Sequence, residues 1–317
     1  SSGIEVNTYS GNMHYERTDV VIPCVGLSLD MTFAYNVNRT KKDSSYGYGW
    51  THTYNWYYEK DTNTGDVTIW NSQGKKDLYT YNGTSYSTPT GVYDTLIEYA
   101  TDEYRLVRTN GISLMFEDAS HRKLTKIEDT NYSNGPFGSA GAMSNTISIE
   151  YTDGKPTKIL NDNSGKYLKL GYSGGHLSYV LDENISPARS WNYTYVNDNM
   201  VRVVDPTGHM VNYVYNTIRK IVSITDKNGN KFTLEYKEDL LSNKTGSVLK
   251  IISPLTEINF DYDYANLTTT VTEEVDGVVQ SSTYVYNSDG WITNKIGNCC
   301  GFDIDGIIPT IRYQNDY

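Results

Sequence analysis

A tyrosine recurs at nearly constant spacing through the second half of the chain. Seven positions share this pattern, and each is followed by a turn-forming stretch: Tyr151, Tyr172, Tyr195, Tyr215, Tyr236, Tyr262 and Tyr286. Consecutive members lie 21, 23, 20, 21, 26 and 24 residues apart. A period of this length indicates a structure built from stacked supersecondary units, so the repeat constrains the fold more than any other feature of the sequence.

One unit of the repeat can be followed between His209 and Gly229. The alternating segment 209–215 is followed by Asn216 and Thr217, and then by a second segment rich in β-branched residues at 219–226. Alternation with a period of two predicts strands, and two short strands joined by a turn form a β-hairpin. A second marker, Asp-x-x-Gly, suits tight turns and separates units at 162–165, 205–208 and 226–229.

The amino-acid composition agrees with an all-β fold. Tyrosine accounts for 30 of the 317 residues and glycine for 26. Tyr, Thr, Val and Ile favour half-buried strands, whereas Gly, Asn and Asp favour turns. Because one hairpin is marginally stable, we expect the units to pair edge to edge in a long curling antiparallel sheet, with the repeat tyrosines packed across strands. Seven or eight units predict an arc or a partial barrel.

The charge of the chain makes nucleic acid an unexpected partner. Lys and Arg number 27 against 38 Asp and Glu, which gives a formal net charge of −11. An acidic chain without a basic cluster repels phosphate. No membrane span is expected either, because the longest apolar run, 20–29, is short and contains Pro23. The chain begins with Ser1 and not with Met, so we expect it to derive from a longer protein.

The repeat resembles the YD-repeat, or Rhs (rearrangement hot spot), family. The units that match most closely run from Gly208 through Tyr215 to Gly229, and from Gly165 through Tyr172. Several units depart from the family pattern, because the Asp that follows Tyr is replaced by Thr152, Ser173, Asn216 and Lys237.

The N-terminal part resembles the lead-in segment that opens proteins of this family. The matching stretches are 11–13, 33–36 and 46–52. We therefore divide the chain into a lead-in β segment at 1–120 and a hairpin array at 121–317. The interval from Phe116 to Tyr151 is 35 residues, and removing 132–144 leaves 22. These 13 residues are predicted to be a loop insertion at a turn.

Strands are also expected in the lead-in, and no helix is predicted. The expected strands lie at 28–36, 51–58, 66–70, 76–81, 103–108 and 112–116. Asn63-Thr-Gly65, Asn82-Gly83 and Asn110-Gly111 are predicted hairpin turns.

No group of residues indicates a catalytic, cofactor or metal site, so the chain is expected not to be an enzyme and to need no cofactor. Asp61-Thr-Asn-Thr-Gly-Asp66 copies the start of a calcium loop, but the twelfth position is Ser72, and a hairpin turn is the preferred interpretation. The five histidines are scattered. Of these, His52 is the best candidate for a chemical role, because it lies in the Gly-Trp-Thr-His run.

Three tryptophans are the candidates for ligand binding. Flat aromatic rings match the apolar faces of sugars, so Trp50, Trp56 and Trp70 could form a stacking surface with neighbouring tyrosines. In a β-protein of this composition such rings more often belong to the core.

The cysteines are the feature that the repeat does not explain. We expect Cys24, Cys299 and Cys300 to be reduced and packed, with a disulfide to Cys24 or a vicinal pair as alternatives.

The family resemblance implies an exported or cell-surface bacterial protein. Sheets of the family encapsulate or display another domain, so further repeats or a C-terminal cargo domain of the parent chain are the expected partners. The expected function is a non-enzymatic structural β-shell segment, acting in toxin delivery or as a surface scaffold. The alternative is a carbohydrate-binding or adhesive cell-surface module, with cell-surface glycans as partners.

Overall fold

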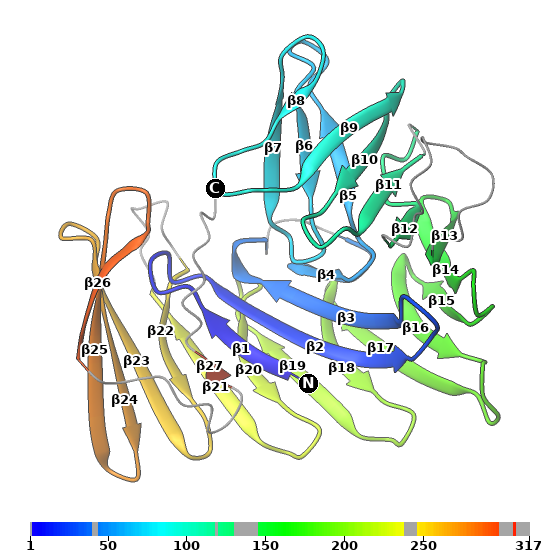
Figure 1. Cartoon of the computed structure of the whole chain (residues 1–317). Helices are drawn as coiled ribbons and strands as arrows, with labels where there is room; N and C mark the ends of the chain where they lie inside the picture. The colour runs from blue at the N-terminus through cyan, green and yellow to red at the C-terminus, as the bar shows by residue number, and fades with distance from the viewer. Residues whose placement is uncertain are drawn as a thin grey trace. The chain divides into compact units, whose positions relative to one another are not determined.

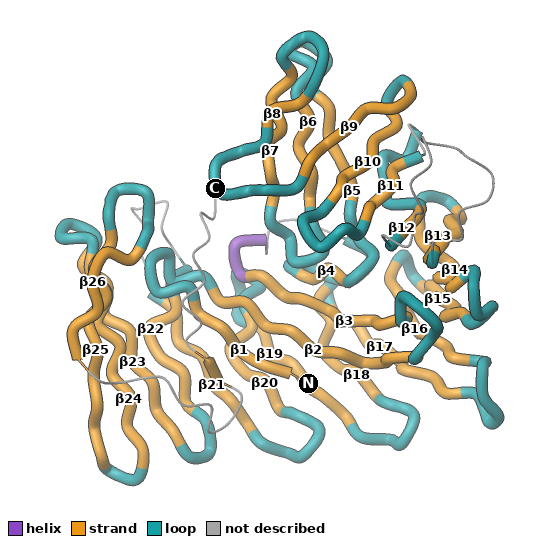
Figure 2. The backbone as a smooth tube through the Cα atoms, in the orientation of Figure 1, coloured by secondary structure: helices purple, strands orange, loops and turns teal. Residues whose placement is uncertain are grey.

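The computed structural model describes residues 2–39, 44–117, 120–129, 145–237, 246–297 and 307–308. Strands make up nearly all of the regular structure in these ranges, accompanied by one short 3-10 helix, η1 (Val37–Arg39), which is purple in Figure 2. The all-β fold class is confirmed. No described helix has the length and apolar character needed to cross a membrane. The predicted insertion at 132–144, Cys299 and Cys300 lie outside the described residues.

The repeats form consecutive strands of a long antiparallel sheet, in which strands β9 to β26 pair in chain order (Figure 1). Its first strands are β9 (Thr95–Ala100), β10 (Glu103–Val107), β11 (Ser113–Phe116), β12 (Lys126–Glu128), β13 (Thr146–Thr152), β14 (Lys155–Asn161), β15 (Tyr167–Ser173) and β16 (His176–Asp182). The others are β17 (Arg189–Val196), β18 (Asn199–Val204), β19 (Met210–Tyr215), β20 (Ile221–Thr225), β21 (Lys231–Tyr236), β22 (Val248–Ile252), β23 (Thr256–Asp263), β24 (Thr268–Val275), β25 (Val278–Tyr286) and β26 (Ile292–Gly297). The predicted long antiparallel sheet of hairpins is confirmed.

The residues before the repeats, together with one strand at 307–308, form two smaller sheets. The first has the order β27-β1-β2-β3-β4 and contains β1 (Ser2–Val6), β2 (Met13–Ile22), β3 (Leu29–Asn36), β4 (Trp50–His52) and β27 (Ile307–Ile308). The second is antiparallel and contains β5 (Tyr57–Lys60), β6 (Val67–Trp70), β7 (Lys76–Tyr81) and β8 (Tyr86–Ser87).

The chain is organised in two compact units. The first unit comprises Ser1–Arg17, Phe33–Trp50 and Asn192–Tyr317, and the second comprises Thr18–Thr32 and Thr51–Trp191. Both units therefore combine lead-in residues with repeats. The division of the sequence near residue 120 stays a prediction.

The core of the first unit is aromatic. Tyr15, Phe33, Tyr35 and Trp50 of the lead-in are each at most 3% exposed. The ring of Trp50 lies 5.1 Å from that of Tyr213, a residue of β19, with an edge-on orientation that suits aromatic pairs. The lead-in residues of this unit thus pack directly on its repeat strands.

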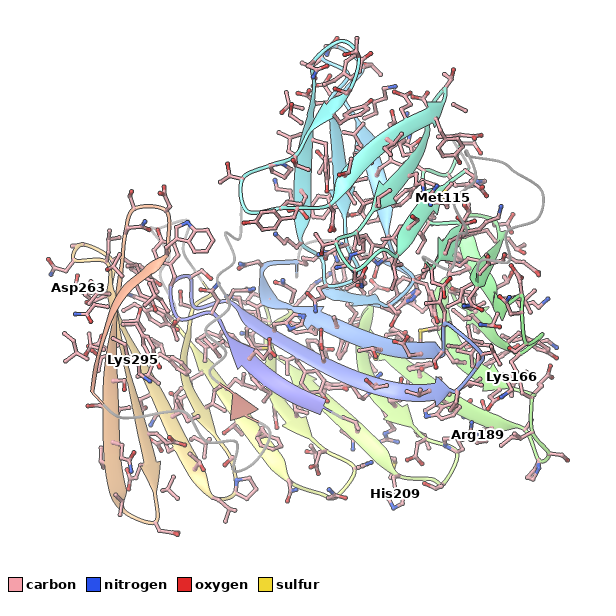
Figure 3. The ribbon with its side chains drawn as sticks, viewed as in Figure 1. Met115, Lys166, Arg189, His209, Asp263 and Lys295 are labelled. Carbon is pink, nitrogen blue, oxygen red and sulfur yellow. The ribbon has the colours of Figure 1, made fainter. Side chains whose placement is uncertain are left out.

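The turns follow the predicted chemistry. In the turn before β19, an Asp205 carboxylate oxygen accepts the backbone N–H groups of Thr207 at 2.9 Å and His209 at 3.0 Å, and His209 is labelled in Figure 3. Gly208 closes the turn with a φ of 90°. The predicted hairpin turns at 63–65, 82–83 and 110–111 are confirmed, because they join β5 to β6, β7 to β8 and β10 to β11.

The predicted strand at 51–58 is wrong in its middle part, because β4 ends at His52 and β5 begins at Tyr57. The backbone N–H of Asn55 donates to the His52 carbonyl at 2.9 Å, and the Thr53 hydroxyl donates to Asp30 at 3.1 Å. These bonds stabilise a turn in a sequence of strand-forming residues. The other five expected strands correspond to β3, β6, β7, β10 and β11.

Candidate functional site

The repeat tyrosines share a position in their hairpins. At six of them the strand register shifts by one residue: Tyr151, Tyr172, Tyr195, Tyr215, Tyr236 and Tyr286. The seventh, Tyr262, pairs with Thr269 in continuous register. A shift of this kind is a β-bulge, which bends the strand and redirects the side chain. The repeat therefore places each of these six rings at a bulge near the end of the first strand of its hairpin.

The hydroxyl groups of four repeat tyrosines link successive hairpins. Tyr172 donates to the carbonyl of Pro156 at 2.9 Å, and Pro156 is the residue paired with Tyr151. The same relation holds for Tyr215 to Met200 at 2.7 Å, Tyr236 to Ile221 at 2.6 Å and Tyr262 to Val248 at 2.8 Å. Each acceptor is the residue paired with the preceding repeat tyrosine. We call this arrangement the tyrosine ladder.

The ladder tyrosines of the first unit are held in the neutral form. Burial raises the pKa of Tyr215 and Tyr262 well above the usual value. Burial likewise raises the pKa of Tyr236. A neutral phenol can donate the ladder hydrogen bond, whereas a phenolate cannot. The observed contacts are structural, and they give these tyrosines no catalytic geometry.

Trp50, one of the three candidate stacking residues, does not fit a ligand-binding role. It is 1% exposed, and its indole N–H donates to the Tyr215 hydroxyl at 2.9 Å. The Arg17 guanidinium lies over the same ring, 5.5 Å from the centroid. A ring covered in this way cannot present a face to a sugar, because binding would first require the core to open.

Trp56 and Trp70, in the second unit, are partly exposed. Trp70 stacks on Tyr57 with a ring-centroid distance of 5.8 Å and an interplanar angle of 11°, and its N–H donates to Glu59 at 3.1 Å. Arg108 lies 5.7 Å from the ring centroid of Trp56. Each of these two tryptophan rings packs against its own partner. Among the described interactions, no contact joins Trp56 and Trp70 into one stacking surface.

The other candidate chemical groups lie in structural positions. Asp61 begins the turn between β5 and β6, where its carbonyl accepts the Gly65 N–H at 2.8 Å. His52 is fully buried, and desolvation, with a smaller contribution from Lys123, lowers its pKa to about 3. Among the residues that the structure describes, no three His, Cys, Asp or Glu side chains gather as a metal site requires.

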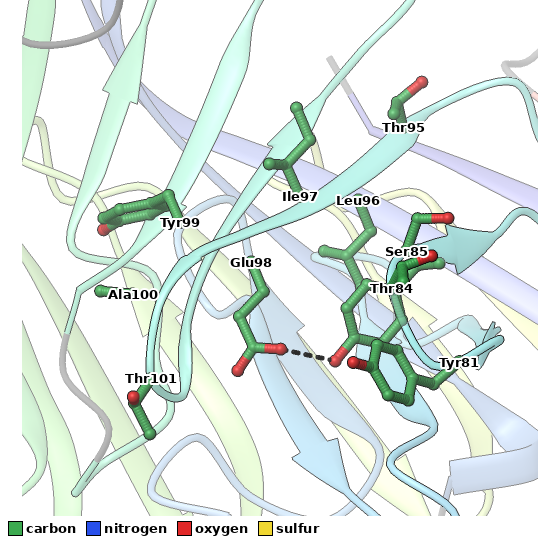
Figure 4. A pocket seen from close by; sticks show the side chains of 11 residues that line it. Tyr81, Thr84, Ser85, Thr95, Leu96, Ile97, Glu98, Tyr99, Ala100 and Thr101 are labelled. Carbon is green, nitrogen blue, oxygen red and sulfur yellow. Dashed lines mark hydrogen bonds between the residues drawn. The ribbon is translucent and has the colours of Figure 1, made fainter.

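A polar groove in the second unit is a candidate site that the sequence did not reveal. It has a volume of about 490 Å³, and eleven side chains from 81 to 101 line it (Figure 4). Tyr86 of β8 donates a hydrogen bond to the Glu98 carboxylate of β9 at 3.0 Å. The Tyr86 hydroxyl also lies 3.3 Å from that of Tyr104. These bonds join the small sheet to the first strands of the long sheet.

The Glu98 carboxylate is fixed from three sides. It accepts the Asp102 backbone N–H at 3.1 Å and the Lys60 ammonium at 3.3 Å, in addition to the Tyr86 hydroxyl. Lys60 also pairs with Asp102 at 2.7 Å. Burial alone would raise the pKa of Glu98, but these hydrogen bonds outweigh it and hold the pKa below its usual value. The groove therefore contains an ionised, positioned acceptor.

Sequence reasoning missed this groove because no motif joins its parts. Lys60, Tyr86, Glu98 and Asp102 come from three strands and a turn, separated by up to 42 residues. The sequence contains one weak indication of the groove. Two acidic residues, Glu98 and Asp102, lie on either side of the end of β9, at the hairpin with β10.

Comparison with known proteins gives one family match. Residues 3–79 match a family model described as a domain of unknown function, DUF6531. This covers less than half of the chain and lies within the predicted lead-in. A search of curated proteins found no match.

Two solved structures of toxin assemblies show a distant similarity. One is a Photorhabdus luminescens Tc holotoxin pore with a mutated TccC3 component, at 11% identity and a TM-score of 0.42, covering 90% of this chain and 17% of that one. The other is a TcdB2–TccC3 protein without its hypervariable C-terminal region, at 12% identity and a TM-score of 0.30, covering 90% of this chain and 16% of that one. The present chain thus spans about a sixth of the length of each.

Proposed function

We propose that the chain is a non-enzymatic structural segment of an exported Rhs-type protein, in which the repeat sheet encapsulates or displays another domain of the same parent chain. The observation that carries this proposal is the tyrosine ladder, whose four described hydrogen bonds each join one hairpin to the preceding hairpin. The match of residues 3–79 to a family model supports the lead-in as a module that recurs in other proteins.

The packing of the first unit indicates what this segment contributes. Lead-in residues bury Trp50 and Tyr35 on the repeats, and Tyr35 donates to the Arg219 carbonyl at 3.1 Å. A sheet face covered by the chain's own lead-in is not available there for cargo. The segment would therefore close off one part of a shell, while further repeats of the parent chain would enclose or display the cargo.

Limited proteolysis of the full parent protein tests this proposal. We expect a second domain of the parent chain to resist cleavage while the array is folded, and to become sensitive when the array is unfolded by denaturant or by ladder substitutions. Equal cleavage rates of that domain with and without an intact array would contradict encapsulation. A domain that is sensitive in both states but remains attached at the cell surface would support display.

The carbohydrate-binding alternative loses Trp50 from its proposed stacking surface. It retains support from a different place, the groove between β8 and β9.

A further inference from the structure

The groove beside Glu98 combines features that suit one class of ligand. Its volume of about 490 Å³ lies in the range of small-molecule sites, which is roughly 300–1,000 Å³. None of the eleven lining side chains is cationic. An anionic ligand would therefore meet the Glu98 carboxylate without a compensating charge in the lining.

The polar part of the lining offers both hydrogen-bond acceptors and donors. Glu98 accepts three described hydrogen bonds, and an ionised carboxylate has about four lone-pair sites, so it can accept a further donor from a ligand. Lys60 lies 3.3 Å from Glu98 and 2.7 Å from Asp102, so its charge offsets that of Glu98 only in part. Exposed hydroxyl groups of Thr84, Ser85 and Thr101 also border the groove. A neutral ligand with many hydroxyl groups matches this set.

The aromatic part of the lining supplies flat apolar surface. The rings of Tyr81 and Tyr86 lie 5.2 Å apart, tilted by 42°. Figure 4 shows Tyr81 at the edge of the groove. Gly65 makes room for this arrangement, because a Cβ there would lie 2.9 Å from the Tyr81 ring. Tyrosine rings beside a carboxylate can contact the C–H face of a sugar while its hydroxyl groups are hydrogen-bonded.

We propose that this groove binds a short neutral saccharide, with Glu98 as an acceptor for one of its hydroxyl groups and the rings of Tyr81 and Tyr86 as the stacking surface. The site does not use the tyrosine ladder, and it lies where the small sheet meets β9, the first strand of the long sheet. A lipid is disfavoured because the lining is mainly polar. An extended peptide is the competing occupant, because β8 and β9 flank the groove.

A glycan array with the intact chain tests the proposal, using neutral oligosaccharides, sialylated or sulfated glycans and a peptide library as separate arms. We expect neutral saccharides to bind. Thr101→Trp should abolish this binding by filling the groove from the turn between β9 and β10. Thr109→Trp is the matched control, because Thr109 is an exposed residue of the next turn and does not line the groove.

Glu98→Gln gives a second, independent measurement. Glutamine keeps one acceptor oxygen but loses the negative charge that strengthens the hydrogen bond, which should weaken binding of the neutral saccharide by about tenfold. Thermal unfolding of each variant separates loss of binding from loss of fold, and Thr101→Trp carries the test if Glu98→Gln does not fold. The proposal is overturned if no neutral saccharide binds at millimolar concentration, if binding survives Thr101→Trp, or if acidic glycans or peptides alone occupy the groove.

Discussion

At the scale of single residues, the Tyr215 hydroxyl has two hydrogen-bonding roles in the first unit. It donates to the Met200 carbonyl at 2.7 Å and accepts the Trp50 indole N–H at 2.9 Å. Tyr215→Phe removes both bonds and leaves two buried polar groups without this partner, so we expect a loss of about 1–3 kcal/mol in the free energy of unfolding. Urea titration measures this loss of stability.

Tyr93→Phe is the control, because Tyr93 is 80% exposed and its substitution should change stability by less than about 0.5 kcal/mol. Equal losses of stability from the two substitutions would show that the ladder hydrogen bonds do not stabilise the fold.

The same buried phenols predict how stability depends on alkaline pH. Burial raises the pKa of Tyr286 to about 12, and that of Tyr215 well above its usual value. The pKa of a tyrosine side chain in the unfolded chain is about 10. Above this pH the unfolded chain therefore loses protons that the folded chain retains. The stabilising contribution is therefore complete below about pH 10 and declines as the pH rises through the folded pKa values. We expect tyrosinate absorbance to rise together with unfolding. Ionisation of all tyrosines near pH 10 in the folded protein would contradict the burial.

At the scale of the elements, the turns specify the register of the hairpins. The turn at 205–208 needs a positive φ at Gly208, and a Cβ added there would meet no atom within 4 Å. Gly208→Ala should therefore cost about 1 kcal/mol through backbone conformation alone. Lys227→Ala, at an exposed position without a positive φ in the Asp-x-x-Gly turn at 226–229, should have little effect on stability. Chemical unfolding of both variants checks this. A stable Gly208→Ala protein would show that the turn can adopt another conformation.

The sequence predicted elements well where their determinants are local. The hairpin of β19 and β20 is specified by residues close together in the sequence, namely the alternating segment 209–215 and the Asp-x-x-Gly turn at 226–229. Both strands and the turn lie where the sequence predicts them. The burial of Trp50 was not predictable in this way. It depends on contacts between residues far apart in the sequence, such as the hydrogen bond from Trp50 to Tyr215, which spans 165 positions.

The candidate groove shows the same limit. Glu98 becomes a positioned acceptor through Lys60 and Tyr86, which no spacing in the sequence connects. The tryptophans were conspicuous by composition, yet Trp50 serves the core. The sequence therefore predicted that the fold contains many aromatic rings. Which of these rings are exposed depends on tertiary contacts that the sequence does not reveal.

At the scale of the whole molecule, the prediction concerns cooperativity. A repeat array in which each hairpin contacts its neighbours unfolds in graded steps. In the first unit, however, the start of the chain contacts several distant repeats. The Ser247 hydroxyl donates to the Ser10 carbonyl at 3.0 Å, and the Tyr286 hydroxyl donates to Thr8 at 2.6 Å. These contacts should make β22 to β25 unfold together with the lead-in of this unit.

Gly11 is the residue through which this coupling can be tested. Its carbonyl accepts the Val248 N–H at 2.9 Å, its φ is 71°, and a Cβ there would lie 2.3 Å from that of Ser247. Gly11→Ala should therefore cost about 2–4 kcal/mol, from the backbone strain and the steric clash together. Hydrogen exchange should show reduced protection in β22, β24 and β25 as well as near residue 11. Gly208→Ala is the matched control, because it shares the positive φ but meets open space. If Gly11→Ala lowers protection only at 7–13, the lead-in docks on the repeats without stabilising them, and the array unfolds independently of it.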